Sequence, residues 1–222
     1  IMPGDLLHID FGITYLRLNT DTQQLAYVLK AGETEVPKYL EDALVVGNRL
    51  QDILTSNFVT GRTGNEILRA ARQQMDKEGI RGSIYTHPLG FYGHSAGPTI
   101  GMWDNQGDTP GAGDFPLHAN TGYAIELNAV VFVKEWNKDV RVMLEEGAYF
   151  DGEKVILPQA THDAYKAYAE SGMLSAAQDY DEGGMQLPYT IEAAANGFFG
   201  LASVSIGSSL LTKGNANLLL VH

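Results

Sequence analysis

Four acidic residues and one histidine have the types and spacing for chemistry at a shared site. Asp10 and Asp21 are eleven residues apart in an alternating run, His94 follows a glycine, and Glu126 and Glu145 lie inside strand-like segments. Taken singly, a loop histidine or a strand glutamate usually has a structural role. A carboxylate in a half-buried strand is nevertheless costly unless it is paired, hydrogen-bonded or bound to a metal. The five residues together therefore predict a common partner.

Two divalent cations are the partner that suits this set. Four carboxylates that converge with one imidazole would repel one another by several kcal/mol in a poorly hydrated site. An oxygen-rich ligand set with one imidazole favours manganese, iron, cobalt or zinc over a thiophilic ion. A pair of such ions, typically about 3.5–4 Å apart, acidifies a shared water molecule into a hydroxide nucleophile. The residues therefore predict a hydrolase.

The composition narrows the partners of such an enzyme. The 222 residues include 27 acidic and 15 basic side chains and no cysteine, and the formal net charge is -12. This charge argues against nucleic acid and anionic membrane surfaces and favours a cationic ligand. Without cysteine, any metal must be held by oxygen and imidazole. No apolar run reaches the ~18–20 residues of a membrane span, so we expect a soluble protein, in the cytoplasm rather than the periplasm.

The first part of the chain is expected to mix strands and helices. Period-two alternation from Gly4 to Lys30 predicts two or three antiparallel strands. Apolar residues at helical spacing predict a helix over Glu35–Phe58. The capping box Thr63-Gly-Asn-Glu66 predicts a second helix over Ile67–Met75, ended by Gly79.

A glycine- and proline-rich stretch follows from Ser83 to Thr121, and so long a connection in a compact domain is usually functional. It holds the candidates His87, His94, Trp103 and Asp104, and also His118, which we expect to be structural. Two strand-like segments come next, Tyr123–Val133 and Val140–Phe150, each with an acid in its middle. After about Pro158 the composition changes, and a helix is expected over Thr161–Glu170.

The order and strand context of the acidic set resemble a known family. Asp10, Asp21, His94, Glu126 and Glu145 look like the ligands of the dinuclear-metal pita-bread family of methionine aminopeptidases, Xaa-Pro aminopeptidases and prolidases. The resemblance covers roughly Met2 to Val155. It implies an α+β pita-bread fold that lacks much of its first pseudo-symmetric half, because the chain starts close to the first ligand strand. It also implies two divalent ions, Mn, Co, Zn or Fe, with manganese favoured.

The resemblance further implies a role for each ligand. Asp10 would chelate one ion, and Asp21 would bridge both. His94 and Glu126 would complete the second ion, and Glu145 would bridge. Glu126 would also shuttle the proton for water attack and amine departure.

Other assignments follow the family less closely. Glu145 matches the family's Ile-Glu-Asp context better than its neighbour Glu146, which is the alternative ligand. His87 is either the family's upstream histidine, which stabilises the tetrahedral intermediate, or a packed loop histidine. Trp103 stands where the family usually has a second histidine that contacts substrate. We therefore expect Trp103 and Asp104 at the substrate site.

The C-terminal residues resemble a different family. The runs His162–Gly172, Asp181–Pro188 and Gly214–Leu219 are similar to parts of the N-terminal helical domain of acyl-CoA dehydrogenases, with Gly-Gly-x-x-Leu-Pro the most telling element. The alternative is a helical extension that packs on the metallopeptidase-like domain. We therefore expect two partial domains, a pita-bread domain over 1–157 and a helical segment over 158–222.

The leading interpretation is a metallo-aminopeptidase that removes an N-terminal residue from a peptide, with an Xaa-Pro bond as the favoured target. The acidic chain suits the α-ammonium group of such a substrate, and a homodimer is compatible with this activity. Two alternatives stay open. One is a flavin-dependent acyl-CoA dehydrogenase fragment, and the other is a non-catalytic pita-bread module that binds peptide or a partner protein.

Overall fold

A computed structural model describes residues 1–202 except for 16–17, 91–92, 157–158, 174–175 and 183. The chain divides into two compact units, Ile1–Ile156 and Leu157–His222. All of the strands that the structure describes belong to the first unit. This boundary lies next to the division at residue 157 that the sequence predicts. The resemblance of residues 158–222 to a dehydrogenase domain stays a prediction.

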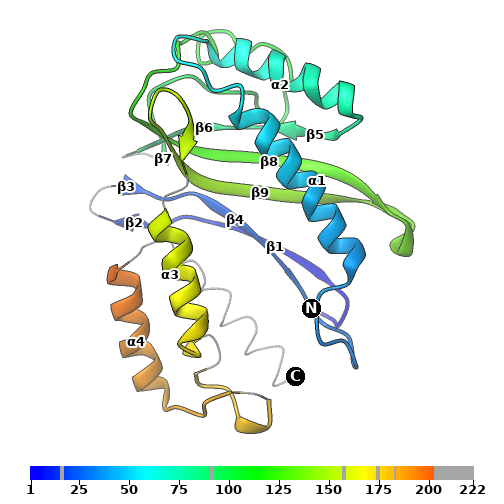
Figure 1. Cartoon of the computed structure of the whole chain (residues 1–222), viewed down its shortest axis with the longest axis vertical. Helices are drawn as coiled ribbons and strands as arrows, with labels where there is room; N and C mark the ends of the chain where they lie inside the picture. Colours follow the sequence, from blue (N-terminus) through cyan, green and yellow to red (C-terminus); the bar gives the residue numbers. More distant parts are fainter. Residues whose placement is uncertain (16–17, 91–92, 157–158, 174–175, 183, 203–222) are drawn as a thin grey trace. The chain divides into compact units, whose positions relative to one another are not determined.

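An antiparallel sheet forms the centre of the first unit (Figure 1). The strands are β1 (Leu6–Phe11), β2 (Thr14–Tyr15), β3 (Leu18–Asn19), β4 (Thr22–Tyr27), β5 (Arg81–Ile84), β6 (His87–Gly90), β7 (Gly93–His94), β8 (Thr121–Val133), β9 (Lys138–Phe150) and β10 (Val155–Ile156). The main sheet has the order β1-β4-β9-β8-β6-β7, with β10 on β9 and β5 on β8. β1 pairs directly with β4, and β2 and β3, which come between them in the chain, pair with each other in a separate two-stranded sheet. The predicted antiparallel pairing of residues 4–30 is confirmed, with four strands over the described residues in place of the two or three predicted.

The β8–β9 hairpin is the longest part of the sheet, and its strands pair along their whole length. A short 3-10 helix, η1 (Lys134–Trp136), joins them. Asn137 follows η1 with a φ of 48°, in the left-handed region that asparagine tolerates. The predicted strands over Tyr123–Val133 and Val140–Phe150 are confirmed.

Two helices, α1 (Lys38–Thr55) and α2 (Gly64–Glu78), pack against one face of this sheet (Figure 1). The apolar spacing of residues 35–58 predicts the first helix and the capping box predicts the second, and both are confirmed. The capping box of α2 is present, since the Thr63 hydroxyl accepts from the Glu66 backbone N–H and the Glu66 carboxylate accepts from the Thr63 N–H. Gly79 ends α2 with a φ of 67°, a left-handed conformation that glycine adopts without strain.

The core lies between these helices and the sheet. Its side chains come from α1, α2, β8 and β9 and from the segments that connect them. The largest fully buried members are Leu50, Ile53, Leu54, Ile67, Leu68, Ile84, Ile100, Leu117, Tyr123, Ile125 and Phe150. This packing makes the helix-facing side of the sheet apolar and leaves the other side for polar residues.

Three short strands occupy the start of the stretch for which the sequence predicted one long connection. β5, β6 and β7 fall between residues 81 and 94, so that prediction is wrong over this part. Both β5 and β6 pair with β8. Strands of two to four residues that contain glycine and proline have too little alternation to be recognised in the sequence. From residue 95 to residue 120 the chain is irregular apart from isolated bridges.

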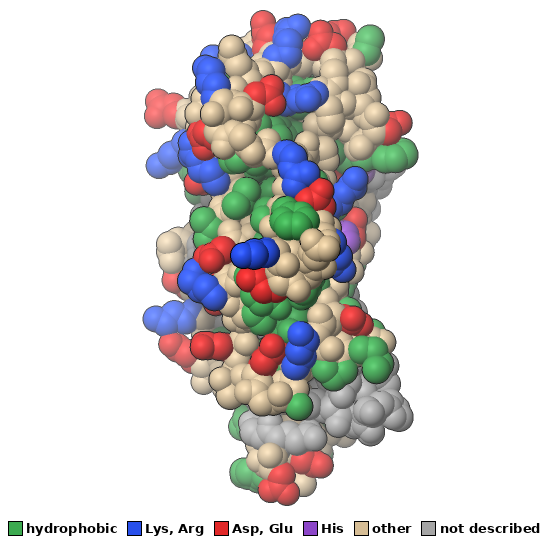
Figure 2. All heavy atoms as spheres, turned by 90° about the vertical axis from the view of Figure 1, so that its right-hand side faces the viewer, with side chains coloured by type: hydrophobic (Ala, Val, Ile, Leu, Met, Phe, Trp, Pro, Cys, Tyr) green, Lys and Arg blue, Asp and Glu red, His purple; other side chains and the backbone are tan. Residues whose placement is uncertain are grey.

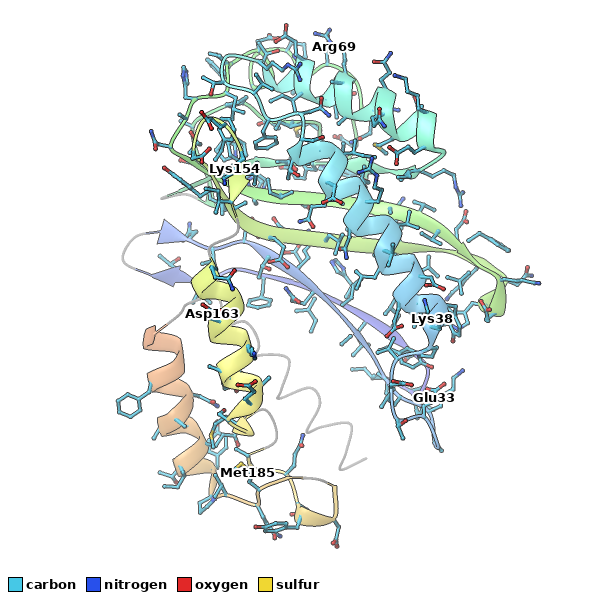
Figure 3. The ribbon with its side chains drawn as sticks, viewed as in Figure 1. Glu33, Lys38, Arg69, Lys154, Asp163 and Met185 are labelled. Carbon is cyan, nitrogen blue, oxygen red and sulfur yellow. The ribbon has the colours of Figure 1, made fainter. Side chains whose placement is uncertain are left out.

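The outer surface of the helices carries both signs of charge. Figure 2 shows acidic and basic side chains interspersed over one face, with hydrophobic side chains between them. Lys38 pairs with Asp42 one turn along α1, and Arg69 on α2 lies 3.0 Å from Asp108 (Figure 3). Such exposed pairs contribute little to stability because water and salt screen them.

The second unit is helical over its described residues. It contains α3 (Gln159–Glu170), η3 (Tyr180–Glu182) and α4 (Tyr189–Ala202), so the predicted helix over Thr161–Glu170 is confirmed within α3. The predicted dehydrogenase-like run Gly214–Leu219 lies outside the described residues. Within the part of the chain that the structure describes, no helix has the length and apolar character needed to cross a membrane.

Candidate metal centre

A row of polar side chains crosses four neighbouring strands at one level of the sheet. Asp10 on β1 is opposite Gln23 on β4, Gln23 is opposite Glu145 on β9, and Glu145 is opposite Glu126 on β8. Directly opposed residues on neighbouring strands point to the same face of a sheet. The register therefore brings three of the predicted ligands and Gln23 onto one face.

This face is the one opposite to the helices. Ile125 and Leu127, which flank Glu126 on β8, belong to the core. Because successive strand residues point to opposite faces, Glu126 points away from that core. Glu146 is opposite Ile125 and so lies on the helix-facing side, whereas Glu145 lies beside Glu126. The structure thus brings Glu145, and not the alternative Glu146, to the other acids.

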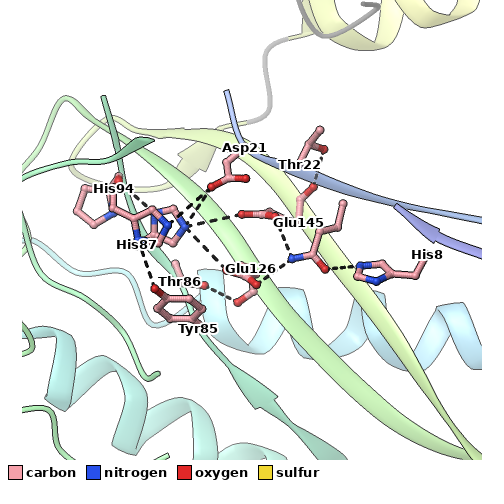
Figure 4. A network of polar contacts seen from close by, with 11 residues as sticks. His8, Asp21, Thr22, Tyr85, Thr86, His87, His94, Glu126 and Glu145 are labelled. Carbon is pink, nitrogen blue, oxygen red and sulfur yellow. Dashed lines mark hydrogen bonds and ion pairs between the residues drawn. The ribbon is translucent and has the colours of Figure 1, made fainter. Parts of the chain in front are cut away.

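His87 lies among these carboxylates (Figure 4). Its Nε2 atom is 3.6 Å from Asp21 Oδ2, 3.8 Å from Glu126 Oε2 and 3.8 Å from Glu145 Oε1. The pairing of His87 with Ala124 on β8 places it on the same face as Glu126, two residues further along that strand. The His87 side chain is only 2% exposed, so it is enclosed rather than lying in a surface loop.

The orientation of the His87 ring leaves one nitrogen for a ligand. Nδ1 lies 3.2 Å from the Pro88 carbonyl oxygen, to which it donates. Metal-binding imidazoles are commonly oriented by such a bond from the second nitrogen. Among the described residues, His87 Nε2 and Glu145 Oε1 are buried and have no hydrogen-bond partner. Two buried, unpartnered polar atoms that face each other fit a metal ion between them, because such atoms are otherwise costly.

Three acids of the site, Asp10, Asp21 and Glu126, have raised pKa values and so hold their protons more tightly than isolated carboxyls. Burial, with a smaller contribution from Glu145, raises the pKa of Glu126 to about 7 and that of Asp21 to about 6. The same two causes raise the pKa of Asp10. Burial lowers the pKa of His87, but nearby Glu145, the backbone carbonyl and Asp21 outweigh it, so the net shift is upward. A divalent cation would relieve this crowding of negative charge.

Three overlapping groups of side chains have the spacing of metal ligands. In each group the ligand atoms lie within 4.8 Å of one another. The groups are Asp21, His87 and His94; His87, Glu126 and Glu145; and Asp10, Asp21 and Glu145. All five predicted ligands therefore converge, together with His87. The donors are carboxylate oxygens and imidazole nitrogens, which fit a hard or borderline divalent ion.

His94 lies at the edge of this cluster. Its ring stacks on that of His87 with centroids 3.7 Å apart and planes at 7°. Its Nε2 is 4.0 Å from Asp21 Oδ2, and its Nδ1 is 3.3 Å from the Tyr85 hydroxyl. The His94 side chain is 54% exposed, and burial together with His87 lowers its pKa. His94 is thus the accessible imidazole of the pair and His87 the enclosed one.

Gln23 is a site residue that sequence reasoning missed. It is buried, and its amide nitrogen donates to Glu126 Oε1 at 2.8 Å and to Glu145 Oε2 at 3.0 Å. Its amide oxygen is 2.7 Å from Nε2 of His8 (Figure 4). A signal was present, since the sequence predicts a strand through this region, residues two apart on a strand share a face, and Gln23 follows Asp21, the residue just before β4, by two.

The predicted substrate residues have a weaker connection to the cluster. Trp103 is 74% exposed. Burial and the charges of Glu126, Asp21 and Glu145 raise the pKa of Tyr85. The charge of Asp104 is the last and smallest of these causes. A role for Trp103 and Asp104 in substrate binding stays a prediction.

Comparisons with known proteins give the family from one profile and the fold from solved structures. The profile of Metallopeptidase family M24 matches residues 1–180. X-Pro aminopeptidase from Thermotoga maritima MSB8 superposes with a TM-score of 0.51 at 20% identity, over 71% of this chain and 41% of that chain. Xaa-Pro dipeptidase from Bacillus anthracis superposes with a TM-score of 0.50 at 19% identity, over 70% of this chain and 39% of that chain. Methionine aminopeptidase from Rickettsia prowazekii superposes with a TM-score of 0.50 at 15% identity, over 69% of this chain and 63% of that chain. A comparison with curated protein sequences found no match.

These similarities establish the fold. The predicted α+β pita-bread fold, with its curled antiparallel sheet, is confirmed. The chain spans 41% of the length of the Thermotoga X-Pro aminopeptidase. This similarity therefore does not assign the activity of the longer protein to this chain. The M24 match continues to residue 180, beyond the unit boundary at Ile156.

Proposed function

Because the chain belongs to metallopeptidase family M24, we propose that it is a dinuclear-metal-dependent hydrolase that removes the N-terminal residue from peptides. The observation that carries this proposal is the approach of three carboxylates, Asp21, Glu126 and Glu145, to His87 Nε2, which is buried without a hydrogen-bond partner among the described residues. At 3.6–3.8 Å the three carboxylates are too far from His87 Nε2 for hydrogen bonds, so this nitrogen is left for a metal ion.

We assign the metal ligands to Asp10, Asp21, His87, Glu126 and Glu145. This set replaces His94, the predicted imidazole ligand, by His87. Three distances support the change, since His87 Nε2 lies within 3.8 Å of three carboxylates while His94 Nε2 approaches one, Asp21, at 4.0 Å. When bound, two divalent ions would supply Lewis acidity that polarises the scissile carbonyl and lowers the pKa of the attacking water.

Glu126 is the residue that we assign to proton transfer. Its side chain is 18% exposed, so one edge is open to a substrate while the rest is enclosed. As a carboxylate among the proposed metal ligands, it can take up a proton and release it again during the reaction. The two proton transfers of peptide hydrolysis, from water and to the departing amine, need such a group.

His94 is the residue that we assign to the substrate carbonyl. It is exposed, stacks on His87 and is held by the Tyr85 hydroxyl, so it offers a hydrogen bond at the mouth of the cluster. Trp103 and Asp104 would line the outer part of the substrate site. The net charge of -12 would attract the α-ammonium group of a peptide.

The finer specificity is part of the proposal. An Xaa-Pro bond as the target is supported by the similarity to X-Pro aminopeptidase and Xaa-Pro dipeptidase structures. Manganese as the ion is compatible with the carboxylate-rich donor set. The similarity to a methionine aminopeptidase favours the other substrate class of the fold. A peptide is the expected partner in both cases.

The test uses the full purified chain after removal of metal by a chelator. Xaa-Pro dipeptides and tripeptides and a Met-Ala peptide are supplied with Mn²⁺, Co²⁺ or Zn²⁺, and release of the first residue is measured. We expect metal-dependent release that favours the Xaa-Pro substrates. Glu126→Gln should lower kcat by about 100- to 10,000-fold, whereas Glu135→Gln, at an exposed residue, serves as the matched control.

Other outcomes would redirect the assignment. Cleavage of only the Met-Ala peptide would assign the methionine class. Bound metal without cleavage of any peptide would contradict the proposed hydrolase activity and favour a peptide-binding module. Bound FAD without metal would instead support the dehydrogenase-like interpretation of residues 158–222.

A further inference from the structure

Gln23 is a neutral amide in the row of acidic residues, at a buried position where a carboxylate or an apolar side chain would be expected. It is 2% exposed and lies between Asp10 and Glu145 in the cross-strand register. A neutral amide in this position adds no negative charge. It also brings two N–H donors into a site whose other members mainly accept.

The direction of the Gln23 amide is determined by its neighbours. Carboxylates accept hydrogen bonds, so the amide nitrogen must face Glu126 and Glu145, and each of its two hydrogens goes to a different residue. The amide oxygen faces His8 Nε2 at 2.7 Å, which donates to it. Every polar atom of the Gln23 side chain therefore has a partner, and turning the amide over would lose its hydrogen bonds to both glutamates.

These bonds divide the oxygens of the two glutamates. Glu126 Oε1 and Glu145 Oε2 are engaged by Gln23 at 2.8 and 3.0 Å. The remaining oxygens, Glu126 Oε2 and Glu145 Oε1, are the ones that face His87 Nε2, each at 3.8 Å. Gln23 thus holds one oxygen of each carboxylate and leaves the other directed at the candidate metal position.

We propose that Gln23 is a positioning residue, which selects the oxygen that each of Glu126 and Glu145 presents to the metal. This inference rests on the proposed function, because it concerns the same site. Residues that orient metal ligands through hydrogen bonds typically account for about 10- to 100-fold in metal affinity. His8 extends the arrangement by one further bond, since it fixes the orientation of the amide.

Metal affinity separates this role from a purely structural one. The experiment titrates Mn²⁺ calorimetrically into the full, metal-stripped chain and measures urea unfolding of the same metal-free protein. Gln23→Met keeps the length of the side chain and removes both donors. Gln24→Met makes the same change one residue along β4, where the amide donates to Thr22 Oγ1 at 3.5 Å and not to the glutamates.

We expect Gln23→Met to weaken Mn²⁺ binding about 10- to 100-fold, and Gln24→Met to leave it unchanged. Gln23→Asn covers the case in which the methionine variant does not fold. It keeps a polar amide in the row but is one methylene too short to reach both glutamates, so it should also weaken binding. The visible spectrum of the Co²⁺-loaded protein should change with Gln23→Met, because the carboxylate oxygens are freed to turn.

Unchanged Mn²⁺ affinity and an unchanged Co²⁺ spectrum in a folded Gln23 variant would overturn the inference, as would an unaltered chain that binds no Mn²⁺. Loss of unfolding stability without loss of affinity would assign Gln23 a structural role only. Metal binding that depends on Gln23 in a chain that cleaves no peptide would leave this inference standing and reject the proposed function. The two failures are therefore distinguishable.

Discussion

The two stacked histidines differ in what each can do, although they are only seven residues apart. His87 is enclosed, its Nδ1 donates to a backbone carbonyl, and its Nε2 faces three carboxylates. His94 is accessible and hydrogen-bonded to Tyr85. An enclosed imidazole with one free nitrogen suits a metal ion, while an exposed one suits a substrate that arrives from solvent.

Substitution of each histidine should therefore have a different effect. His87→Ala should weaken Mn²⁺ binding by more than the roughly 10- to 100-fold that loss of an orienting residue causes, because a ligand is removed. His94→Ala should leave Mn²⁺ affinity nearly unchanged and lower kcat/KM for peptides. Calorimetric titration and steady-state kinetics on the two variants measure both quantities. Loss of metal from His94→Ala but not from His87→Ala would restore the assignment predicted from the sequence.

At the scale of elements, the site depends on strands whose opposite face packs against a helix. β9 carries Glu145 on one face and Val142 and Leu144 on the other, where α1 packs. Gly47 of α1 permits the close approach of helix and strand. A Cβ atom at this position would lie 2.9 Å from Leu144 Cδ1 and 3.0 Å from Val142 Cγ1.

Gly47→Val should therefore push α1 away from β9. Overpacking of this kind typically costs about 1–3 kcal/mol, and the loss should appear as a lower urea midpoint. Asn48→Val adds the same side chain at the next, exposed position of α1 and is the matched control. Equal midpoints for the two variants would contradict close packing at Gly47.

At the scale of the whole molecule, the acidic cluster makes stability depend on pH. The pKa of Glu126, ordinarily near 4.5, is raised to about 7 in the folded chain. Between these values the folded chain keeps a proton that the unfolded chain has released, so its stability falls as the pH rises. Asp21, with a pKa raised to about 6, acts in the same direction.

The metal-free chain should therefore lose stability between about pH 5 and about pH 8, by up to about 3 kcal/mol from Glu126. Glu126→Gln should flatten this dependence, because the amide has no proton to lose. Mn²⁺ at about 100 times its Kd should restore about 2.7 kcal/mol at the higher pH. Urea unfolding at both pH values measures all three effects, and an unchanged pH dependence in Glu126→Gln would refute the assignment.

Much of this protein follows from local sequence patterns. Alternation, helical spacing and the capping box at Thr63 predict β1, β4, β8, β9, α1 and α2, because each signal involves residues close together in the chain. The acids of the site stand out for the same reason, as carboxylates in strands that are otherwise apolar. From these the family resemblance, the fold and the kind of cofactor could be predicted.

The tertiary structure decided which residues meet. Whether His87 or His94 faces the carboxylates depends on the pairing of β6 with β8, and β6 is too short for its alternation to be recognised. The role of Gln23 depends on the register of β4 against β9, which joins residues 122 positions apart. Sequence spacing determines the face of a strand on which a residue lies. Only the long-range register determines which side chains stand opposite one another, and therefore which atoms can share a metal ion.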